Sequence, residues 1–270
     1  MGARHGHVSA RKPRNDAARR EAVVSSLVVR VVGVGDAFTT RHFNASFLVE
    51  AGATRILVDA PPALGRALGD LGARGGPPIG LADIDHVVIT HLHGDHVGGL
   101  EQLLFFRRFV TGKRVALHAA PEVLAGLWET RLRGGMDTLM SPDGTRTSLT
   151  LDDYADVSPL GAGTNSIGDL DLEWRPTIHH IPTSALRFSA GGARFGYSAD
   201  TAFDPTLIDW LAEADLFFHE TNLGVHTPLA SLVGLPEDVK RRMRLIHYPD
   251  FHDPEHSPIV CTHEGERFEI

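Results

Sequence analysis

Short apolar runs and segments with helical spacing alternate along the first half of the chain. Runs that are typical of buried strands cover residues 28–34, 46–50, 54–59, 85–90 and 115–118. Apolar residues at helical spacing cover residues 62–71, 97–109 and 121–132. Glycine, proline and polar residues dominate 73–80 and 134–150, which we expect to be surface loops. The first half is therefore predicted to alternate strands with helices.

The second half continues this alternation with more strands. Paired strands are predicted at 167–178, with a turn at Gly168-Asp169, and a hairpin at 186–188 and 193–198 turns at Gly191-Gly192. Further strands are predicted at 216–219, 245–247 and 267–270, and helices at 204–214 and 236–244. Strands thus come in runs that helices separate. Two mixed sheets, each covered on its outer side by helices, account for this order, and the predicted fold class is α/β.

The chain is long enough for one large α/β domain or two small ones, because it has 270 residues, of which 42% are hydrophobic. Its net charge of −8 is unevenly distributed: residues 1–20 hold six basic residues against Asp16, a net of +5, which leaves −13 for the rest. An acidic body disfavours a broad nucleic-acid-binding surface. A small anionic substrate is compatible with it, because bound divalent metals reverse the charge locally.

Residues 1–22 are expected to be a disordered basic extension, or the product of a misassigned start codon, and residues 23–270 a single domain. The pair Arg19-Arg20 could suggest a twin-arginine signal, but the following run contains Arg30 and fits a first core strand better. No stretch is long enough to span a membrane. The single cysteine, Cys261, excludes an intrachain disulfide and a thiolate metal cage. Together these features favour a cytoplasmic location.

The most informative segment is His91-Leu-His-Gly-Asp-His96, directly after the predicted strand 85–90. It places three imidazoles and a carboxylate on one loop, and these groups are ligands of zinc, iron and manganese. The chain has 16 histidines, so some clustering arises by chance, but this spacing at a strand end favours a metal site. One loop cannot usually close a coordination sphere. Further candidate ligands follow later predicted strands, at His179-His180, Asp200, His219-Glu220 and His247.

These motifs resemble those of the metallo-β-lactamase fold superfamily over about residues 27–270. The resemblance implies an αββα four-layer sandwich of two mixed sheets flanked by helices, with a dinuclear metal site at one edge of the sheets. It assigns His91, His93 and His179 to the first metal, Asp95, His96 and His247 to the second, and Asp200 to a bridge between them. The implied cofactors are two divalent metals, zinc in the first place, with manganese and iron as alternatives.

Such a site makes a hydrolytic nucleophile without a strong base. Two cations roughly 3.5–4 Å apart can clamp the attacking and leaving oxygens of a displacement. Water bound to such a metal can have a pKa of about 7, so that a metal-bridging hydroxide attacks the substrate. Asp95 is expected to orient this hydroxide and is therefore a candidate catalytic residue. Asp59, at a strand end beside the site, is expected to orient a histidine ligand.

The neighbours His179 and His180 require a choice. Adjacent residues of a strand point to opposite faces, so only one of them can face the metals. The sequence around them resembles the ribonuclease Z-like branch, which favours His179 as the ligand. His180 is then expected to support a ligand or to face the substrate. His42 lies on a loop that often borders the substrate pocket in this fold, and we expect it there.

A histidine after Glu220-Thr221 points to a general acid. In ribonuclease Z-like enzymes a His-Ser/Thr pair follows a corresponding segment, and its histidine is thought to protonate the leaving oxygen. His226-Thr227 stands at comparable spacing, so His226 is a candidate catalytic acid and Thr227 a candidate substrate-side residue; the alternative is an ordinary loop histidine. Only 20 residues separate His179 from Asp200, where ribonuclease Z carries a long tRNA-gripping arm. A small phosphodiester is therefore favoured over tRNA 3′ processing.

The leading hypothesis is a dinuclear metal-dependent phosphodiesterase that acts on a small substrate such as a cyclic nucleotide. A hydrolase of lactones, thioesters or β-lactams is the alternative, because the same ligands serve acyl transfer. A non-catalytic binding protein that kept the fold is disfavoured by the complete ligand set. The expected partner is a small-molecule substrate, with no large nucleic acid and no membrane. Relatives are often dimers, so a homodimer is compatible with the resemblance.

Overall fold

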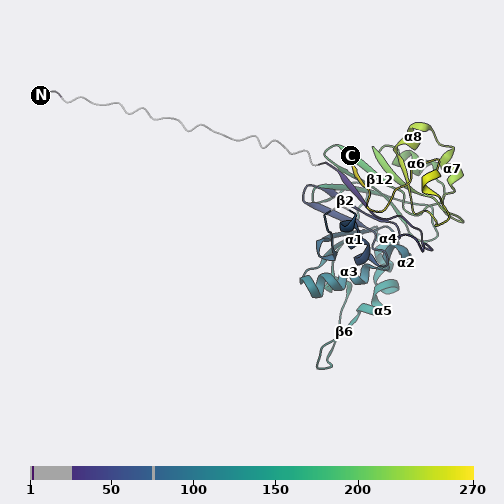
Figure 1. Ribbon diagram of the computed structural model, residues 1–270. Coiled ribbons are helices and arrows are strands. Elements are labelled where there is room, and N and C mark those ends of the chain that lie inside the picture. The colour runs from purple at the N-terminus through teal and green to yellow at the C-terminus, as the bar shows by residue number, and fades with distance from the viewer. Residues whose placement is uncertain (1, 3–25, 75–76) are drawn as a thin grey trace.

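The computed structural model of the protein describes Gly2 and residues 26–74 and 77–270 (Figure 1). The basic extension predicted at 1–22 lies outside the described residues except for Gly2. Gly75 and Gly76 of the predicted loop 73–80 also lie outside them. Within the described residues, every helix is too short or too polar to cross a lipid bilayer.

The first of two large sheets has seven strands. Their order is β15 (Arg267–Glu269), β1 (Val28–Gly33), β2 (Ser46–Ala51), β3 (Thr54–Val58), β4 (His86–Ile89), β5 (Val115–Ala119) and β8 (Ala155–Pro159). The strands from β15 to β3 pair antiparallel, and those from β3 to β8 pair parallel. The sheet is therefore mixed, as predicted.

The second large sheet has six strands and is also mixed. Their order is β14 (Met243–Ile246), β13 (Leu216–Glu220), β12 (Ala193–Tyr197), β11 (Ser184–Ala190), β10 (Leu170–Pro176) and β9 (Asn165–Ile167). The strands β12, β13 and β14 pair parallel, and the others pair antiparallel. The parallel strands end at the same edge of their sheet, and this edge carries the candidate ligands.

The two sheets pack face to face around an aromatic core. Phe47 of β2 contacts three rings of the second sheet edge-on: its centroid lies 5.4 Å from Phe195, 4.9 Å from Tyr197 and 5.6 Å from Phe218. Its neighbour Leu48 belongs instead to the outer core, on the helix side of the sheet. Successive strand residues point to opposite faces, so a continuous apolar run such as this one is buried on both sides.

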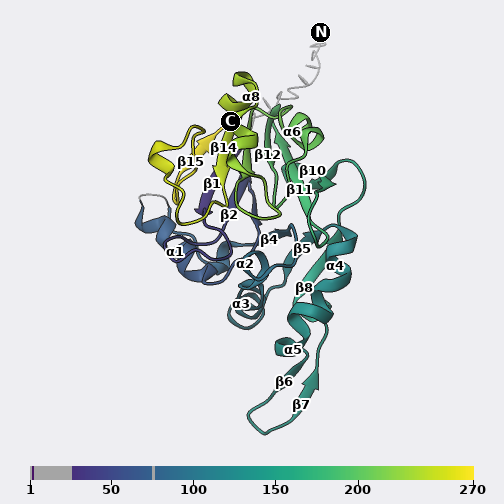
Figure 2. The same cartoon turned by 90° about the vertical axis from the view of Figure 1, so that its right-hand side faces the viewer.

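Helices cover the outer face of each sheet (Figure 2). The first sheet packs against α1 (Leu64–Ala73), α3 (Leu100–Phe106) and α4 (Pro121–Leu127), whose leucines lie in the outer core. The second sheet packs against α6 (Pro205–Leu211), α7 (Leu229–Val233) and α8 (Glu237–Arg242). Short helical turns complete the chain at η1 (Leu81–Asp83), η4 (Leu151–Asp153) and η5 (Pro254–His256). The predicted αββα four-layer sandwich is confirmed.

The helix predicted at 97–109 is broken in the structure. A short helix α2 (Gly94–Val97) precedes α3, and α3 ends in the π-helical turn η2 (Arg107–Thr111). The break falls at Gly98 and Gly99, where a Cβ on Gly99 would overlap the carbonyl oxygen of Pro61. The two glycines therefore let the chain turn closely over the preceding loop, which separates the ligand-bearing helix α2 from α3.

The surface loop predicted at 134–150 is partly wrong, because the segment contains regular structure. The π-helical turn η3 (Trp128–Leu132) and helix α5 (Arg133–Met136) lead into a hairpin of β6 (Thr138–Met140) and β7 (Arg146–Ser148). This hairpin projects from the body (Figures 1 and 2). Both of its faces are largely exposed, so its sequence lacks the alternation of apolar and polar residues by which half-buried strands are recognised.

Candidate metal centre

The loop after β4 presents the first four candidate ligands. Its chain turns into α2, where the backbone N–H groups of His96 and Val97 donate to the carbonyl oxygen of His93 at 3.1 and 3.0 Å. This turn places Asp95 and His96 on the buried side, with exposed fractions of 8% and 0%. The glycine between His93 and Asp95 is exposed. The local fold thus points the side chains of the motif into one place.

The first cluster consists of His91, His93, His179 and Asp200, each with one donor atom within 4.8 Å of the others. The Nε2 atom of His91 lies 3.1 Å from Nδ1 of His93 and 3.5 Å from Oδ2 of Asp200. The Nε2 atom of His179 lies 3.4 Å from the same Nδ1 of His93. Three imidazole nitrogens that converge in this way leave room for a shared cation.

The second cluster consists of Asp95, His96 and His247. Oδ2 of Asp95 lies 3.3 Å from Nε2 of His96 and 3.2 Å from Nε2 of His247. The other oxygen of Asp200, Oδ1, lies 3.3 Å from Nε2 of His96. Asp200 therefore faces the first cluster with Oδ2 and the second with Oδ1. This is the arrangement that a bridging carboxylate needs.

Unpaired buried atoms indicate that the clusters suit metal ions. Nε2 of His96 and Oδ1 of Asp200 are buried and have no hydrogen-bond partner among the described residues. A buried polar atom without a partner is unfavourable by roughly 1–3 kcal/mol. A set of imidazoles and carboxylates is suited to zinc, iron or manganese. The residues present therefore fit divalent metals, and the number and identity of the ions stay predictions.

The pKa values of the histidines are shifted in opposite directions in the two clusters. Burial lowers the pKa of His91 to about 3 and that of His179 to about 4, so both rings are neutral, as ligands must be. Burial alone would also lower the pKa of His247, but Asp200 and Asp95 outweigh it and raise this pKa to about 10. A cation bound in the second cluster would thus replace the proton that the carboxylates favour on His247.

Asp59 supports one ligand of each cluster. It follows β3, with φ of 59°, and its Oδ2 accepts a hydrogen bond from Nδ1 of His96 at 2.8 Å. It also accepts from the hydroxyl of Thr90 at 2.8 Å, and that hydroxyl lies 3.0 Å from Nδ1 of His91. When Nδ1 carries the proton, Nε2 of each ring keeps its lone pair for a metal. The structure thus places Asp59 where the orienting role predicted for it requires.

Glu220 is a residue of the site whose contacts were not foreseen from the sequence. It ends β13, is fully buried, and accepts a hydrogen bond from Nδ1 of His226 at 2.9 Å. The backbone N–H of Thr201 also donates to it, at 2.7 Å. Burial lowers the pKa of His226, but the hydrogen bond and charge of Glu220 outweigh it and raise this pKa. The sequence signals for it were a charged residue at the end of a buried apolar strand and its place in the segment before His226-Thr227.

His226 lies at the edge of the clusters, with Nδ1 3.9 Å from Oδ2 of Asp200. Since Nδ1 donates to Glu220, the other ring nitrogen is left for the cleft that His226 lines. The neighbouring Thr227 is placed differently: its buried hydroxyl donates to the carbonyl oxygen of Thr201 at 2.9 Å. Thr227 therefore holds the loop and does not line the cleft.

His179 and His180 lie beyond the end of β10, in a bend, so the alternation of strand residues does not separate them. The prediction that the two residues alternate along a strand is wrong. The structure places His179 in the first cluster and the exposed His180 on the cleft wall, with its Nε2 2.9 Å from Nε2 of His93. Both rings thus contact His93 from the same bend.

His42, which was expected at the substrate pocket, faces away from the clusters. Its Nδ1 lies 3.8 Å from Oε1 of Glu264, and its ring contacts Tyr248 edge-on with centroids 5.8 Å apart. It is absent from the residues that line the cleft. The structure therefore brings together the seven predicted ligands with Asp59, His226 and His180, and leaves His42 and Thr227 outside the cleft.

The clusters form the floor of an open cleft of about 1090 Å³. His93, Asp95, Asp200, His226 and His247 lie on its floor. Its walls come from the segments that follow β1, β13 and β14. A ligand in this cleft would therefore touch both clusters at once.

Comparison with known sequences finds a matching protein family. A family model described as "Anti-Pycsar protein Apyc1" matches residues 27–263. The chain is 34% identical over 231 residues to an anti-Pycsar protein Apyc1 of Paenibacillus harenae, covering 82% of this chain and 90% of the relative. It is 33% identical over 237 residues to a protein of the same name from Bacillus phage BSP38, covering 82% and 89%.

Comparison with solved structures gives the fold. The metallo-β-lactamase fold protein YhfI from Bacillus subtilis matches with a TM-score of 0.70 at 17% identity, over 90% of this chain and 99% of that one. A diphosphatase of the PhnP family matches with 0.69 at 18% identity, over 90% and 98%. The short form of human tRNase Z matches with 0.63 at 16% identity, over 89% and 98%. The metallo-β-lactamase fold implied by the sequence motifs is confirmed.

Proposed function

The chain belongs to the family of anti-Pycsar protein Apyc1, and from this membership and the geometry of the clusters we propose that it is a phosphodiesterase for a small substrate such as a cyclic nucleotide. As a metallo-β-lactamase fold protein with clustered ligands, it is a metal-dependent hydrolase. The observation that carries the narrower proposal is the pair of His226 and Glu220, which holds a proton donor beside the ligands.

Each group of the site has a role in such a reaction. Bound divalent metals would activate water and neutralise the charge of the phosphate. Asp95 touches His96 and His247 through Oδ2 alone, so its Oδ1 is available to accept a proton from the attacking water. The contact with Glu220 raises the pKa of His226 and so favours the protonated ring, which donates a proton to the sugar oxygen as the ester bond breaks. An alkoxide needs this proton because it is a poor leaving group.

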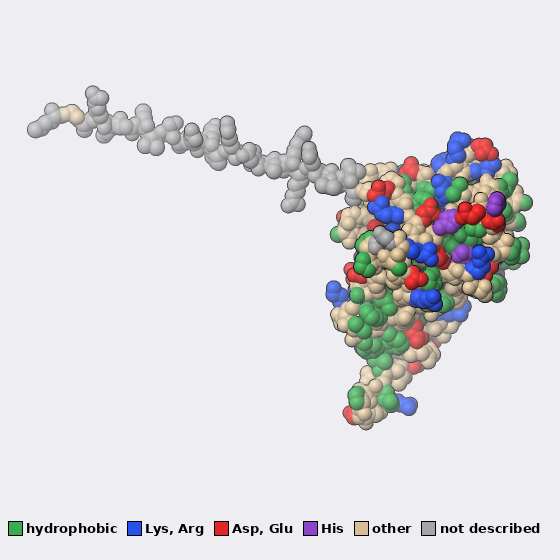
Figure 3. All heavy atoms as spheres, in the orientation of Figure 1, with side chains coloured by type: hydrophobic (Ala, Val, Ile, Leu, Met, Phe, Trp, Pro, Cys, Tyr) green, Lys and Arg blue, Asp and Glu red, His purple; other side chains and the backbone are tan. Residues whose placement is uncertain are grey.

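The shape of the molecule favours a small substrate. Between His179 and Asp200 the chain forms only the short hairpin of β11 and β12. The projecting β6–β7 hairpin carries Asp143 and Arg146 and no cluster of basic residues. On the face in Figure 3 basic and acidic side chains are interspersed. A large nucleic acid would need a continuous basic surface, so we expect a small molecule as partner.

The test compares substrates that differ in their leaving group. The purified protein with Zn²⁺ or Mn²⁺ should hydrolyse 3′,5′-cyclic nucleotides and bis-p-nitrophenyl phosphate. His226→Ala should lower kcat for the cyclic nucleotide by on the order of 10²–10⁴. It should change the p-nitrophenyl reaction far less, because p-nitrophenolate leaves without protonation. Product formation followed by phosphorus NMR and by absorbance measures both reactions.

The alternative reaction class gives a different result. Rapid cleavage of acyl-homoserine lactones or thioesters without turnover of any phosphodiester would contradict the proposal. An unchanged kcat of His226→Ala with cyclic nucleotides would remove the role of general acid while leaving the hydrolase in place.

A further inference from the structure

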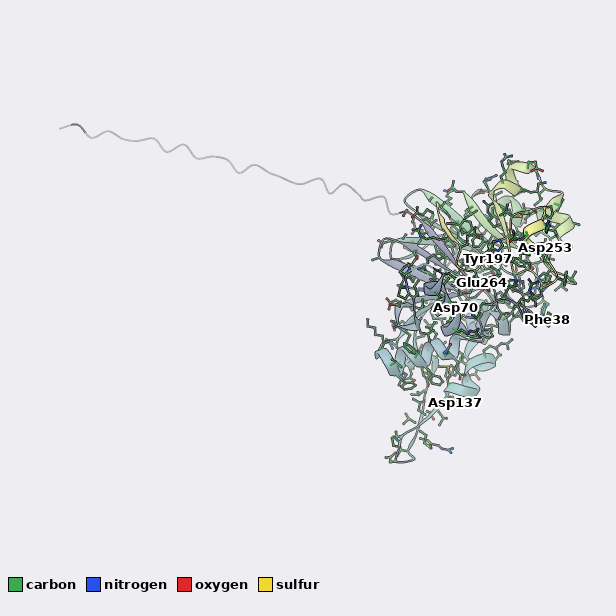
Figure 4. The ribbon with its side chains drawn as sticks, in the orientation of Figure 1. Phe38, Asp70, Asp137, Tyr197, Asp253 and Glu264 are labelled. Atoms are coloured by element: carbon green, nitrogen blue, oxygen red, sulfur yellow. The ribbon has the colours of Figure 1, made fainter. Side chains whose placement is uncertain are left out.

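Aromatic side chains stand exposed at the mouth of the cleft. Phe38 is 88% exposed and Phe251 is 71% exposed, the highest values among the large hydrophobic side chains of the described residues. Both line the cleft whose floor holds the clusters, and Leu223, 66% exposed, lines it as well. Figure 4 shows Phe38 at the edge of the body, on the same side as Asp253 of the neighbouring loop. The cleft thus has a charged floor and an apolar mouth.

The loops that carry these rings are held in place by two carboxylates. Oδ1 of Asp250 accepts a hydrogen bond from the hydroxyl of Thr39 at 2.5 Å, and its Oδ2 accepts one from the backbone N–H of Thr40 at 2.7 Å. Asp250 directly precedes Phe251, and Thr39 directly follows Phe38. Asp250 therefore links the loop of Phe251 to the loop of Phe38 by hydrogen bonds, although about 210 positions separate the bonded residues along the chain.

Asp36 links the loop of Phe38 by hydrogen bonds to Asn222, in the segment after β13 that forms another wall of the cleft. Its carboxylate accepts hydrogen bonds from the backbone N–H of Phe38 at 3.0 Å and from the side-chain amide of Asn222 at 2.9 Å. Asp36 is 3% exposed, so these bonds are shielded from water. The exposure of Phe38 is therefore fixed by the loop structure and is not a consequence of a loose chain.

A fixed and exposed aromatic side chain beside a site points to a ligand. An aromatic side chain buries roughly 150–250 Å² when it is covered, and apolar rims of this kind mark binding sites. A nucleotide has two ends of the matching kind: a charged phosphate for the clusters and a flat base for the apolar mouth. A homoserine lactone with an aliphatic acyl chain has no such flat ring.

We propose that Phe38 and Phe251 form a subsite that stacks the nucleobase of the substrate while its phosphate lies at the clusters. This inference rests on the proposed function and adds a binding determinant to it. Stacking on aromatic rings tolerates different bases, because every base has a π-face. Purines present a larger face than pyrimidines, so the subsite contributes more to binding a purine nucleotide.

The test uses three substrates that share one scissile group. These are adenosine and uridine 3′,5′-cyclic monophosphate and the abasic methyl riboside 3′,5′-cyclic phosphate. In Phe38→Ala and in Phe251→Ala, kcat/KM for the adenosine substrate relative to the abasic one should fall roughly tenfold. The loss should appear in KM rather than in kcat, and it should be smaller for the uridine substrate. Phe38→Trp should restore the ratio.

A matched control is Phe109→Ala, which removes an exposed phenylalanine, 55% exposed, from outside the cleft. Its substrate ratios should equal those of the parent protein. Equal ratios in the parent and in both cleft variants would overturn the subsite. A change in molar mass by light scattering, with equal losses on all three substrates, would instead make the aromatic mouth a contact between two copies and would also overturn it.

Failure of the aromatic subsite can be distinguished from failure of the proposed phosphodiesterase function. A parent protein that hydrolyses none of the three substrates contradicts the phosphodiesterase. Calorimetric titration with the adenosine and abasic substrates then still decides the subsite, because tighter binding of the adenosine substrate must depend on Phe38 and Phe251. Binding that is identical for both substrates would overturn it.

Discussion

At the scale of single residues, the site depends on carboxylates that do not face the cleft. Asp59 holds His96 directly and His91 through Thr90, so one buried side chain orients a ligand of each cluster. Glu220 does the same for His226 and lies 3.7 Å from Nδ1 of His247. Such partners fix the ring orientation and the position of the proton.

Asp59→Asn should weaken metal binding without unfolding the protein. Asparagine has nearly the same shape and tolerates the left-handed backbone of this position, but it lacks the charge that holds the ring of His96. Changes to such partners lower metal affinity by roughly 10–100-fold, which competition with a fluorescent zinc chelator measures. Asp209→Asn, in an exposed position of α6, is the control and should bind zinc like the parent. Equal affinities of all three proteins would contradict the orienting role of Asp59.

Glu220→Gln should impair the proton donor more than the metal site. The amide of glutamine cannot provide the charge that raises the pKa of His226, so less of the ring is protonated at neutral pH. We expect kcat for cyclic nucleotides to fall at least about tenfold, with a smaller effect on bis-p-nitrophenyl phosphate. Loss of both activities together with the bound metal would show instead that Glu220 supports His247.

At the scale of elements, glycines decide where helices end and how close they come. The chain passes Pro62 at Gly98 and Pro61 at Gly99, and this close approach separates α2 from α3. The helix α1 also contains a glycine, Gly69, but there a Cβ would meet no atom within 4 Å. The same residue type is thus required in one helix and dispensable in the other.

Alanine at these two glycines should therefore change stability in opposite directions. Gly99→Ala forces a side chain against Pro61 and should lower the free energy of unfolding by roughly 1–3 kcal/mol. Gly69→Ala should raise it by roughly 0.5–1 kcal/mol, because alanine is the better helix former. Urea unfolding followed by circular dichroism measures both. A neutral Gly99→Ala would mean that the break between α2 and α3 does not need the glycine.

At the scale of the whole molecule, the clusters join the two sheets. His91, His93, Asp95 and His96 follow the first sheet, and His179, Asp200 and His247 follow strands of the second. Without an ion, the buried carboxylates and imidazoles between the sheets stabilise each other only through protons. A bound metal should thus stabilise the packing of the two sheets against each other.

Removal of metal should lower the melting temperature of the entire protein. An ion at 100 times its Kd stabilises the folded state by about 2.7 kcal/mol, which corresponds to a shift in Tm on the order of 5–10 °C for a domain of this size. Chelation followed by addition of Zn²⁺ and calorimetry measures the shift. Asp200→Ala should lose most of it, whereas Asp209→Asn should keep it. A parent protein with the same Tm in chelator and in zinc would argue against metal between the sheets.

The sequence predicted the sandwich and the grouping of the candidate ligands because both have local signals. Apolar runs mark strands that are buried on both faces, and the loop 91–96 and His247 follow such strands. The strand β8 was missed because Ala155–Pro159 lies at the sheet edge and has little apolar character. The role of Glu220 was missed because it depends on Thr201 and His226, which only the folded chain brings to it. Asp36 and Asp250 were missed for the same reason.

The order of the ligands along the chain has a consequence for biosynthesis. His247, in the second cluster, stands 152 positions after its partner Asp95. During translation the loop 91–96 leaves the ribosome long before β14 exists. A nascent chain therefore holds only part of the site until His247 has been synthesised. We therefore expect the second cluster to bind its metal only after the second sheet has formed.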